Sequence, residues 1–376
     1  MRCLFLLAFV AAATALAPYH IPAKNRIQGR YIVVLEDGVE VDSFISRFER
    51  DVSVETRITS KFSKVLNGFV IQADVAGVAL NLLRSLQGVK YVEEDEVIFA
   101  YGRNESPGSW GIDRIDQREM TQNGDMDLSG YGAGQYIYVI DTGINKDHND
   151  FDNNRAGSAA DMLGGNGDDC NGHGTHCAGT AASKSYGVAN EANVLGIRVL
   201  NCFGSGYKSD SIKALDWIAT DGVTPSVASM SLGGSLSDSQ NEAVANARNN
   251  NIVVVVAAGN DNANACNYSP ASAPEAITVG ATDETDTRSY FSNYGSCVDL
   301  FAPGSDIVSL SAFDDDGTRT LSGTSMACPH VSGIAAVMLG MGLSAEEVYS
   351  KIVDDATPDC VNDAGNSSPN LMAYCD

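Results

Sequence analysis

From residue 110 onward, the chain alternates strongly apolar runs with segments of helical periodicity. The apolar runs cover residues 135–141, 192–200, 225–232, 251–259 and 275–282, and the helical segments include 209–220 and 237–250. Continuous apolar strands separated by helices are typical of a parallel sheet that is buried on both faces. The sequence therefore predicts an α/β fold in which helices cover both faces of a parallel sheet.

Residues 24–101 have a different pattern, which predicts a small separate unit. Strand-like runs lie at 29–38, 61–74 and 90–101, and the segments 41–52 and 78–89 have helical spacing. We read the order as β-α-β-α-β, with a strand pair around Asn67-Gly68, and predict a small α+β, ferredoxin-like domain. The polar stretch GRNESPGS that follows is predicted to be an exposed linker.

The first seventeen residues, MRCLFLLAFVAAATALA, form a distinct segment. Arg2 precedes an apolar stretch from about Leu4 to Ala13, and small residues lead up to Ala17. This is the pattern of a secretory signal peptide cleaved after Ala17, and a buried N-terminal helix is the alternative. We therefore predict a secreted, extracellular protein whose cysteines are candidates for disulfide bonds. No later apolar run approaches the roughly 18 residues of a membrane-spanning helix.

The acidic residues are concentrated in the C-terminal part of the chain. Residues 1–104 hold 12 Lys and Arg against 12 Asp and Glu, whereas residues 105–376 hold 12 against 36. A net charge of −24 on the second part argues against nucleic acid or an anionic membrane as a partner. The same charge is compatible with calcium binding or with a simply acidic, solvated surface.

Polar residues stand at the ends of two predicted strands and at the starts of two predicted helices. Asp141 ends the run YIYVID, and Asn260 follows the run IVVVVAAG. His173 opens a small-residue helix between two glycines, and Ser325 opens another helix in GTSMACPH. In parallel sheets, functional groups collect at the carboxyl ends of strands, so we expect these side chains to meet.

The chain has five histidines, and a histidine base must be one of them. His20 lies beside the predicted signal peptide, and His148 lies in a polar loop that we expect to face water. His176 falls inside a small-residue helix, and His330 shares a helix with Ser325 but points to another face. His173 is the remaining candidate.

These residue types suit nucleophilic catalysis by a serine. A carboxylate from Asp141 would orient the imidazole of His173, which would take the proton of Ser325. The N–H of Ser325 at a helix N-terminus, together with the amide of Asn260, would stabilise an oxyanion. Each fragment alone is common, but four fragments at plausible element ends predict an active site.

Over residues 105–345 the chain resembles the subtilisin-like serine proteases, and within them the proteinase K group. The resemblance rests on the segments VIDTGI, NGHGTHCAGT, AAGN and GTSMACPH, with SWGIDRID, NYSPAS and SNYGS supporting the group. Residues 24–101 resemble the family's inhibitory propeptide, which also assists folding. The resemblance implies a signal peptide at 1–17, a propeptide at 18–104 and a peptidase domain at 105–376.

The resemblance also implies the function and the site. It implies a secreted serine endopeptidase of broad specificity, monomeric and made as an autoprocessed zymogen, that acts on polypeptides and is inhibited by its own propeptide. It assigns Asp141, His173 and Ser325 to catalysis and Asn260 with Ser325 to the oxyanion hole. Extended substrate would pair with Gly204, Ser205, Gly206, Ser231, Leu232 and Gly233, and Ala257, Ala258 and Gly259 would flank a pocket for apolar or aromatic residues.

Two other functions remain open on the sequence. A catalytically silent binding protein on a protease scaffold would not need all four polar residues. A cysteine hydrolase would use Cys328 or Cys177, although both read more simply as buried apolar side chains. Serine-directed and thiol-directed inhibitors separate these alternatives.

The cysteine pairing follows from the resemblance and not from the spacing alone. It implies disulfides between Cys170 and Cys202 and between Cys266 and Cys297. Cys360 and Cys375 would then close the C-terminal tail. No bond is expected between Cys177 and Cys328.

Structural calcium is the metal that the resemblance implies, with no catalytic metal. One candidate site comprises Asp113, Asp116, Gln117, Asn123 and Asp125, and a second comprises Asp299 with backbone carbonyls near Pro274 and Ala276. Solvated surface acids are the alternative for both. A zinc site made from Asp169, His173, His176 and Cys177 is a further, competing interpretation.

Overall fold

The protein is described from a computed structural model. The structure describes residues 16–22, 24–51, 56–73, 76–100, 103–104, 110–120, 124, 126 and 128–376. Nearly all of the predicted signal peptide lies outside these residues. Within them, no helix is both long enough and apolar enough to span a membrane.

The N-terminal unit is a mainly antiparallel sheet with two helices on one face, and its short first strand pairs in parallel with the last one. Its elements are β1 (Tyr19–His20), β2 (Arg26–Leu35), α1 (Val41–Asp51), β3 (Thr56–Phe62), β4 (Gly68–Ala73), α2 (Ala76–Ser85) and β5 (Val89–Ala100). The strand order β5-β2-β4-β3 is the predicted ferredoxin-like arrangement. The chain order is β-α-β-β-α-β, because the predicted strand pair around Asn67-Gly68 is two full strands.

The C-terminal part is built around a parallel sheet. The sheet has the order β19-β20-β16-β15-β13-β11-β7-β9-β8, in which β19 and β20 form the antiparallel pair at one edge. Its strands are β7 (Tyr136–Asp141), β8 (Ala156–Asp161), β9 (Asn193–Arg198), β11 (Ser226–Met230), β13 (Ile252–Ala257), β15 (Ile277–Thr282), β16 (Leu300–Pro303), β19 (Thr357–Pro358) and β20 (Leu371–Met372). The apolar runs of the sequence correctly located β7, β9, β11, β13 and β15.

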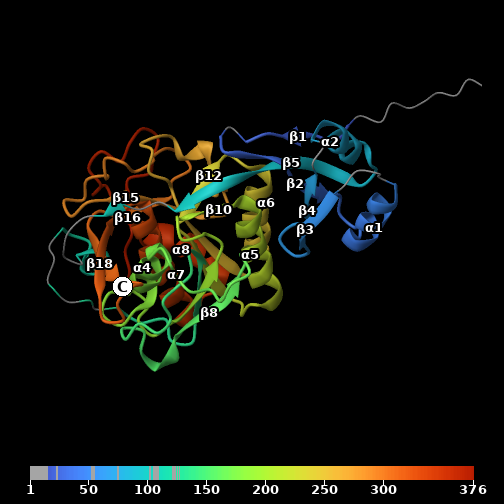
Figure 1. The fold of residues 1–376 in the computed structure, drawn as a ribbon. Coiled ribbons are helices and arrows are strands. Elements are labelled where there is room, and N and C mark those ends of the chain that lie inside the picture. Colours follow the sequence, from blue (N-terminus) through green and yellow to red (C-terminus); the bar gives the residue numbers. More distant parts are fainter. Residues whose placement is uncertain are drawn as a thin grey trace, which may run out of the picture.

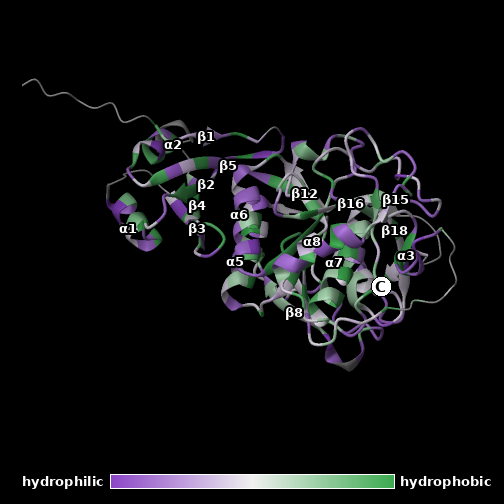
Figure 2. Ribbon diagram, turned by 180° about the vertical axis from the view of Figure 1, so that it is seen from behind, coloured by the Kyte–Doolittle hydropathy of each residue, from purple (hydrophilic) through white to green (hydrophobic). Residues whose placement is uncertain are grey.

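Helices cover both faces of this sheet, as predicted. On one face α4 (His173–Ala182), α7 (Thr324–Gly340) and α8 (Ala345–Asp355) enclose a core of small and branched side chains. On the other face lie α5 (Lys208–Asp221) and α6 (Asp238–Asn249), which Figures 1 and 2 show between the central sheet and the N-terminal unit. These two helices are therefore packed between two sheets.

The N-terminal sheet shares an apolar core with α5 and α6. This core includes Ile32, Val34, Phe62, Val70, Ile212, Leu215, Ala243 and Val244. Figure 2 shows hydrophilic residues on α6 as well, which is consistent with a helix that meets polar groups of β5. Asp216 of α5 accepts hydrogen bonds from the backbone N–H groups of Ser63 (3.0 Å) and Val65 (3.1 Å). Apolar burial and hydrogen bonds together hold the two parts against each other.

Short elements complete the structure. They are β6 (Arg103–Asn104), α3 (Gly111–Ile115), β10 (Ser205–Tyr207), β12 (Leu232–Ser235), β14 (Tyr268–Ser269), β17 (Ile307–Leu310), β18 (Thr318–Ser322) and the 3-10 helices Asp152–Asn154 and Ala265–Asn267. The strand β6 lies within the stretch that was predicted to be an exposed linker. Its residues pair with Leu321 and Ser322 of β18, so their backbone is hydrogen-bonded.

Candidate active site

The carboxyl ends of three neighbouring strands define one edge of the central sheet. Strand β11 pairs in parallel with β7 on one side and with β13 on the other. Asp141 is the last residue of β7, Ser231 follows the end of β11, and Asn260 stands three residues after the end of β13. Because these ends lie side by side, residues between 29 and 119 positions apart in the sequence come to the same edge.

His173, the first residue of α4, lies against Asp141. Its Nδ1 donates to the carboxylate, at 2.8 Å from Oδ1 and 2.9 Å from Oδ2 of Asp141, and both side chains are buried. Burial acts to lower the pKa of His173, but the Asp141 carboxylate outweighs it, and the pKa lies well above its usual value. The close approach requires glycine at position 174, where a Cβ atom would lie 2.1 Å from the carbonyl oxygen of Gly143.

Asp169 fixes the segment that leads into α4. One carboxylate oxygen accepts hydrogen bonds from the N–H groups of Asn171 (3.0 Å) and Gly172 (2.8 Å). The other accepts from the N–H and the hydroxyl of Thr175, at 2.9 and 2.6 Å. The sequence suggested Asp169 only as a zinc ligand. Its place four residues before the start of a helix could have indicated this capping role.

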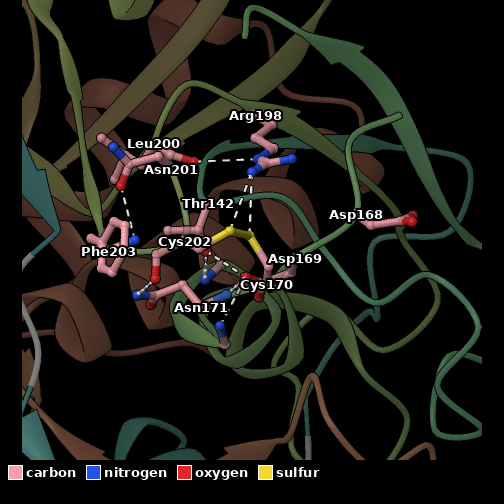
Figure 3. The surroundings of a disulfide bond; sticks show 12 residues. Thr142, Asp168, Asp169, Cys170, Asn171, Arg198, Leu200, Asn201, Cys202 and Phe203 are labelled. Carbon is pink, nitrogen blue, oxygen red and sulfur yellow. Dashed lines mark hydrogen bonds between the residues drawn. A yellow bond between two sulfur atoms is a disulfide. The ribbon is translucent and has the colours of Figure 1, made fainter. Parts of the chain in front are cut away.

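The Cys170–Cys202 disulfide ties the same segment to the loop before β10. Figure 3 shows this bond with Arg198 beside it, whose Nη2 lies 3.3 Å from the sulfur of Cys170. The side-chain amide of Asn171 donates to the carbonyl oxygen of Cys202 (3.0 Å). The disulfide thus links the start of α4 to one of the predicted substrate-binding strands.

Ser325 lies in the first turn of α7, beside the end of β11. Its hydroxyl donates to the carbonyl oxygen of Ser231 (3.1 Å), and the hydroxyl of Ser231 donates back to the carbonyl oxygen of Ser325 (2.9 Å). Ser325 is also linked to the α4 helix through Cys177. The sulfur of Cys177 donates to the carbonyl oxygen of Ser325 (3.4 Å) and lies 3.9 Å from Nδ1 of His173. The sulfur of Cys177 therefore contacts both the backbone of Ser325 and the imidazole of His173.

Thr324 orients the side chain of Asn260. The N–H and the hydroxyl of Thr324 both donate to Oδ1 of Asn260, at 2.9 and 2.8 Å. With its oxygen held in this way, the side chain of Asn260 keeps its NH₂ group as a donor next to Ser325. This role of Thr324 was not predicted. The hydroxyl side chain directly before the serine in GTS could have indicated that Thr324 binds a neighbouring polar group.

The two cysteines near the site are buried thiols. Burial raises the pKa of Cys177 and raises that of Cys328 to about 12, so neither forms a thiolate near neutral pH. Cys328 donates to the carbonyl oxygen of Val255 (3.4 Å), and it is not bonded to Cys177. The geometry therefore gives no support to a cysteine nucleophile.

The side chains of the zinc alternative do not converge. His176 turns away from His173, and its Nε2 donates to the carbonyl oxygen of Ile307 (2.9 Å). Burial lowers the pKa of His176 to about 3. Asp169 is engaged by the groups at the start of α4. Among the described residues, the acidic, His and Cys groups that lie close enough to share a metal ion are Asp141, His173 and Cys177.

Two other histidines are buried away from the site. His330 donates from Nδ1 to the carbonyl oxygen of Met326 (2.7 Å), and burial lowers its pKa to about 4. His148 was predicted to face water, and this prediction is wrong. It is 3% exposed, and its Nε2 donates to the carbonyl oxygen of Gly317 (2.9 Å), so the loop folds over it.

The end of β5 lies between the two predicted substrate-binding strands. Residues 97–99 pair antiparallel with β10, and residues 99–100 pair antiparallel with Leu232 and Gly233 of β12. Gly204 precedes β10, and Ser231 precedes β12. After residue 102 the chain continues as β6 beside β18, which ends three residues before Ser325. The segment before residue 101 is thus paired with β10 and β12, and residues 103–104 are paired with β18, the strand that leads to Ser325.

The remaining predicted pocket residues lie beyond the end of β13. Ala257 ends this strand, and Ala258 and Gly259 are buried. Gly259 has φ +101°, and a Cβ atom there would lie 2.4 Å from the amide nitrogen of Asn293. Gly259 therefore cannot be replaced by a larger residue without strain, and together with Ala257 and Ala258 it forms an apolar wall of small residues beside Asn260.

The first candidate calcium site is only partly covered by the structure, because Asn123 and Asp125 lie outside the described residues. Within the set, Gln117 donates to Oδ1 of Asp113 (2.7 Å), so its amide nitrogen, rather than its oxygen, faces that carboxylate. In the second set Asp299 is partly buried, and this burial raises its pKa to about 6. One backbone N–H, from Thr278, donates to it (2.7 Å), and the loop holding Pro274 and Ala276 precedes β15.

The structure contains two of the three expected disulfides. Cys170–Cys202 and Cys266–Cys297 are formed. The expected Cys360–Cys375 bond is wrong, because both cysteines are free. Cys375 belongs to the core around α7, whereas Cys360 packs against a separate cluster around Phe301. The two side chains are therefore held in different cores.

Comparisons with known proteins agree with this architecture. Residues 132–371 match the Subtilase family. The chain is 42% identical over 388 residues to an extracellular serine proteinase of Thermus sp. (strain Rt41A), which covers 97% of this chain and 94% of the relative. It is 39% identical over 357 residues to Proteinase R of Parengyodontium album, covering 93% and 89% of the two chains. The crystal structure of a cold adapted subtilisin-like serine proteinase matches with a TM-score of 0.69 and 45% identity, over 72% of this chain and 99% of that one.

The fold and these relatives define an extracellular serine-type endopeptidase that acts on polypeptides. The chain belongs to the subtilase family.

Proposed function

We propose that Ser325 is the nucleophile of this peptidase, with His173 as its general base and Asp141 as the group that orients the base. The hydrogen bond between His173 and Asp141, beside the helix start that carries Ser325, is the observation that carries this assignment. Ser325 attacks the scissile carbonyl carbon and passes its proton to Nε2 of His173. Water then hydrolyses the acyl-enzyme and restores the serine.

The oxyanion of each tetrahedral intermediate is stabilised by two donors. One is the backbone N–H of Ser325 at the N-terminus of α7, and the other is the side-chain amide of Asn260. The hold of Thr324 on the oxygen of Asn260 supports this role, because it turns the NH₂ group toward the site. A catalytically silent scaffold would have no use for this arrangement.

The protein is made as a precursor in three parts. Residues 1–17 form a signal peptide, residues 18–104 an inhibitory propeptide and residues 105–376 the peptidase domain of a monomeric enzyme. The pairing of β5 with β10 and β12 supports intramolecular inhibition, since it fills the path of an extended substrate. The enzyme cuts its own chain between Ala100 and Glu105, and the gap between the end of β5 and the start of β6 favours residues 100–103.

Substrate is held mainly through its backbone, which supports broad specificity. The strands around Gly204, Ser205 and Gly206 and around Ser231, Leu232 and Gly233 offer main-chain groups on both sides of the cleft. Ala257, Ala258 and Gly259 wall a pocket for an apolar or aromatic residue before the cut.

Calcium stabilises the peptidase domain, and Asp299 is its best-supported ligand. A partly buried carboxylate with one N–H donor and a pKa raised by burial fits a cation. Backbone carbonyls near Pro274 and Ala276 would complete this site. The other proposed calcium site comprises Asp113, Asp116, Gln117, Asn123 and Asp125.

The precursor and its Ser325→Ala variant test the assignment directly. We would follow the mass of both proteins over time in calcium and assay a chromogenic peptide with and without a serine-directed fluorophosphonate. We expect the wild type to lose the residues before the cut and become active, and the variant to stay intact and inactive. Equal maturation of both would rule out self-processing, and peptidase activity in the variant would rule out Ser325 as the nucleophile.

A further inference from the structure

Lys208 carries a buried positive charge next to the substrate path. It is the first residue of α5, and its side chain is 0% exposed. Its Nζ lies 2.8 Å from Oε1 of Glu96 and 3.1 Å from Oε1 of Glu93, both of which belong to β5. The N-terminus of a helix is the positive end of its dipole and an unfavourable place for a lysine. An anion from outside the peptidase domain offsets this charge here.

Lys208 differs in this respect from other basic residues of the peptidase domain. Arg114, Lys146, Arg155, Arg198, Arg248, Arg288 and Lys351 each form an ion pair with an acidic residue of the same domain. Among the described residues, the carboxylates within ion-pair distance of Lys208 are those of Glu93 and Glu96. Removal of the N-terminal unit would leave Lys208 facing the cleft without them.

Glu96 sits where a side chain of an extended substrate would sit. It stands two residues before Ile98, which pairs with Gly206 of β10, so both side chains point to the same face of β5. Both lie over Gly234 of β12, where a Cβ atom would be 2.6 Å from Oε1 of Glu96 and 3.2 Å from Cγ2 of Ile98. The carboxylate therefore occupies a space bounded by the backbone of β12 on one side and by Lys208 on the other.

We propose that Lys208 is a specificity-determining residue that selects a carboxylate side chain in the substrate, at the position two residues before the one that pairs with Gly206. The inference rests on the proposed function, because it takes β5 to follow the path of a substrate. The peptidase domain has a net charge of −24 and repels acidic peptides at long range. Lys208 reverses this preference locally, where it can contact one acidic side chain.

The expected effect on cleavage is moderate, because an ion pair between Lys208 and a peptide carboxylate is less buried than its ion pairs with the whole N-terminal unit. Partly exposed ion pairs change an equilibrium by roughly twofold to tenfold. We expect a peptide with glutamate at this position to be cleaved with a kcat/KM about threefold to tenfold above that of its glutamine counterpart. The difference should lie mainly in KM and should shrink with added salt, since it arises from binding and from charge.

Three internally quenched peptides test the proposal on the mature enzyme. They copy residues 94–107 of the chain and carry glutamate, glutamine or lysine at the position of Glu96, and mass spectrometry confirms that all three are cut at the same bond. The enzymes are the wild type, Lys208→Met and Lys208→Glu. Lys213→Met is the matched control, because it removes a charge from the same helix five residues further on.

The pattern of preferences decides the outcome. We expect the wild type and Lys213→Met to prefer glutamate, Lys208→Met to lose this preference and to cleave the glutamate peptide no faster than the other two, and Lys208→Glu to prefer lysine most strongly. Equal cleavage of the peptides by the wild type would overturn the proposal, even if a variant failed to fold. A glutamate preference that persists in Lys208→Met would overturn it as well. Failure of the catalytic assignment would be recognised separately, as activity in Ser325→Ala.

Discussion

Asp210 makes the stability of the precursor depend on pH. It lies in the first turn of α5, is 6% exposed, and faces Arg30 and Asp95 of the N-terminal unit. Burial raises its pKa from the ordinary 3.8 to about 7; Asp95 adds to the rise, while Arg30 and Lys213 oppose it. Between these two values the folded precursor binds more protons than the unfolded chain. The free energy of unfolding therefore falls as the pH rises through this window.

The raised pKa sets the size of the effect. A difference of about three pKa units at about 1.4 kcal/mol per unit gives an upper figure of about 4 kcal/mol. Asparagine keeps the shape of Asp210 and does not titrate. We therefore expect Asp210→Asn to exceed its parent in stability by about 2–4 kcal/mol near pH 8 and to match it near pH 4.

Urea unfolding of the precursor across this pH range measures the effect. Both proteins should carry Ser325→Ala, which prevents self-digestion during the experiment. Glu191→Gln, at an exposed position, is the control and should follow the parent at every pH. If Asp210→Asn and its parent lost the same free energy of unfolding between pH 4 and pH 8, the assignment of this pH dependence to Asp210 would be wrong.

Three further predictions concern the site and its supports. Asp141→Asn should lower kcat by about 10⁴. Because Asp141 raises the pKa of His173, the residual activity of this variant should also begin at a lower pH than the activity of the parent. An unchanged pH profile would contradict the pairing of Asp141 with His173. Replacing Cys170 and Cys202 together by serine opens a loop of 32 residues and should lower the free energy of unfolding by about 3–4 kcal/mol, measured with urea; a loss under about 1 kcal/mol would mean that hydrogen bonds alone hold the segment. Chelation of calcium should lower the Tm of the parent by more than that of Asp299→Asn, which lacks one of the two proposed sites, and an equal drop in both would mean that Asp299 holds no calcium.

The sequence predicted those parts of the site that depend on backbone topology. Asp141 and Asn260 follow apolar runs, and parallel strands present their carboxyl ends at one edge, so their meeting could be expected without coordinates. Ser325 and His173 stood out because glycines and small residues mark helix starts. These signals are local, so each can be recognised from the sequence alone.

Other features depend on contacts that no local pattern carries. Cys360 and Cys375 were paired as the cysteines left over in the C-terminal tail, but packing places them in different cores, so the fold does not make this bond. His148 lies among polar residues, but Gly317 reaches it across 169 positions of the chain. Asp169 and Thr324 act through hydrogen bonds to neighbouring groups, which become apparent only when the side-chain directions are known.

The sharing of β5 between the two parts of the chain has a consequence for when inhibition ends. Before the proposed cut, two residues join β5 to β6, and such a short tether holds the strand near the cleft at an effective concentration on the order of millimolar. After the cut, the same strand must find the cleft at the much lower concentration of the secreted protein. The proposed inhibition, made by identical contacts, would therefore weaken after the cut as the secreted protein is diluted.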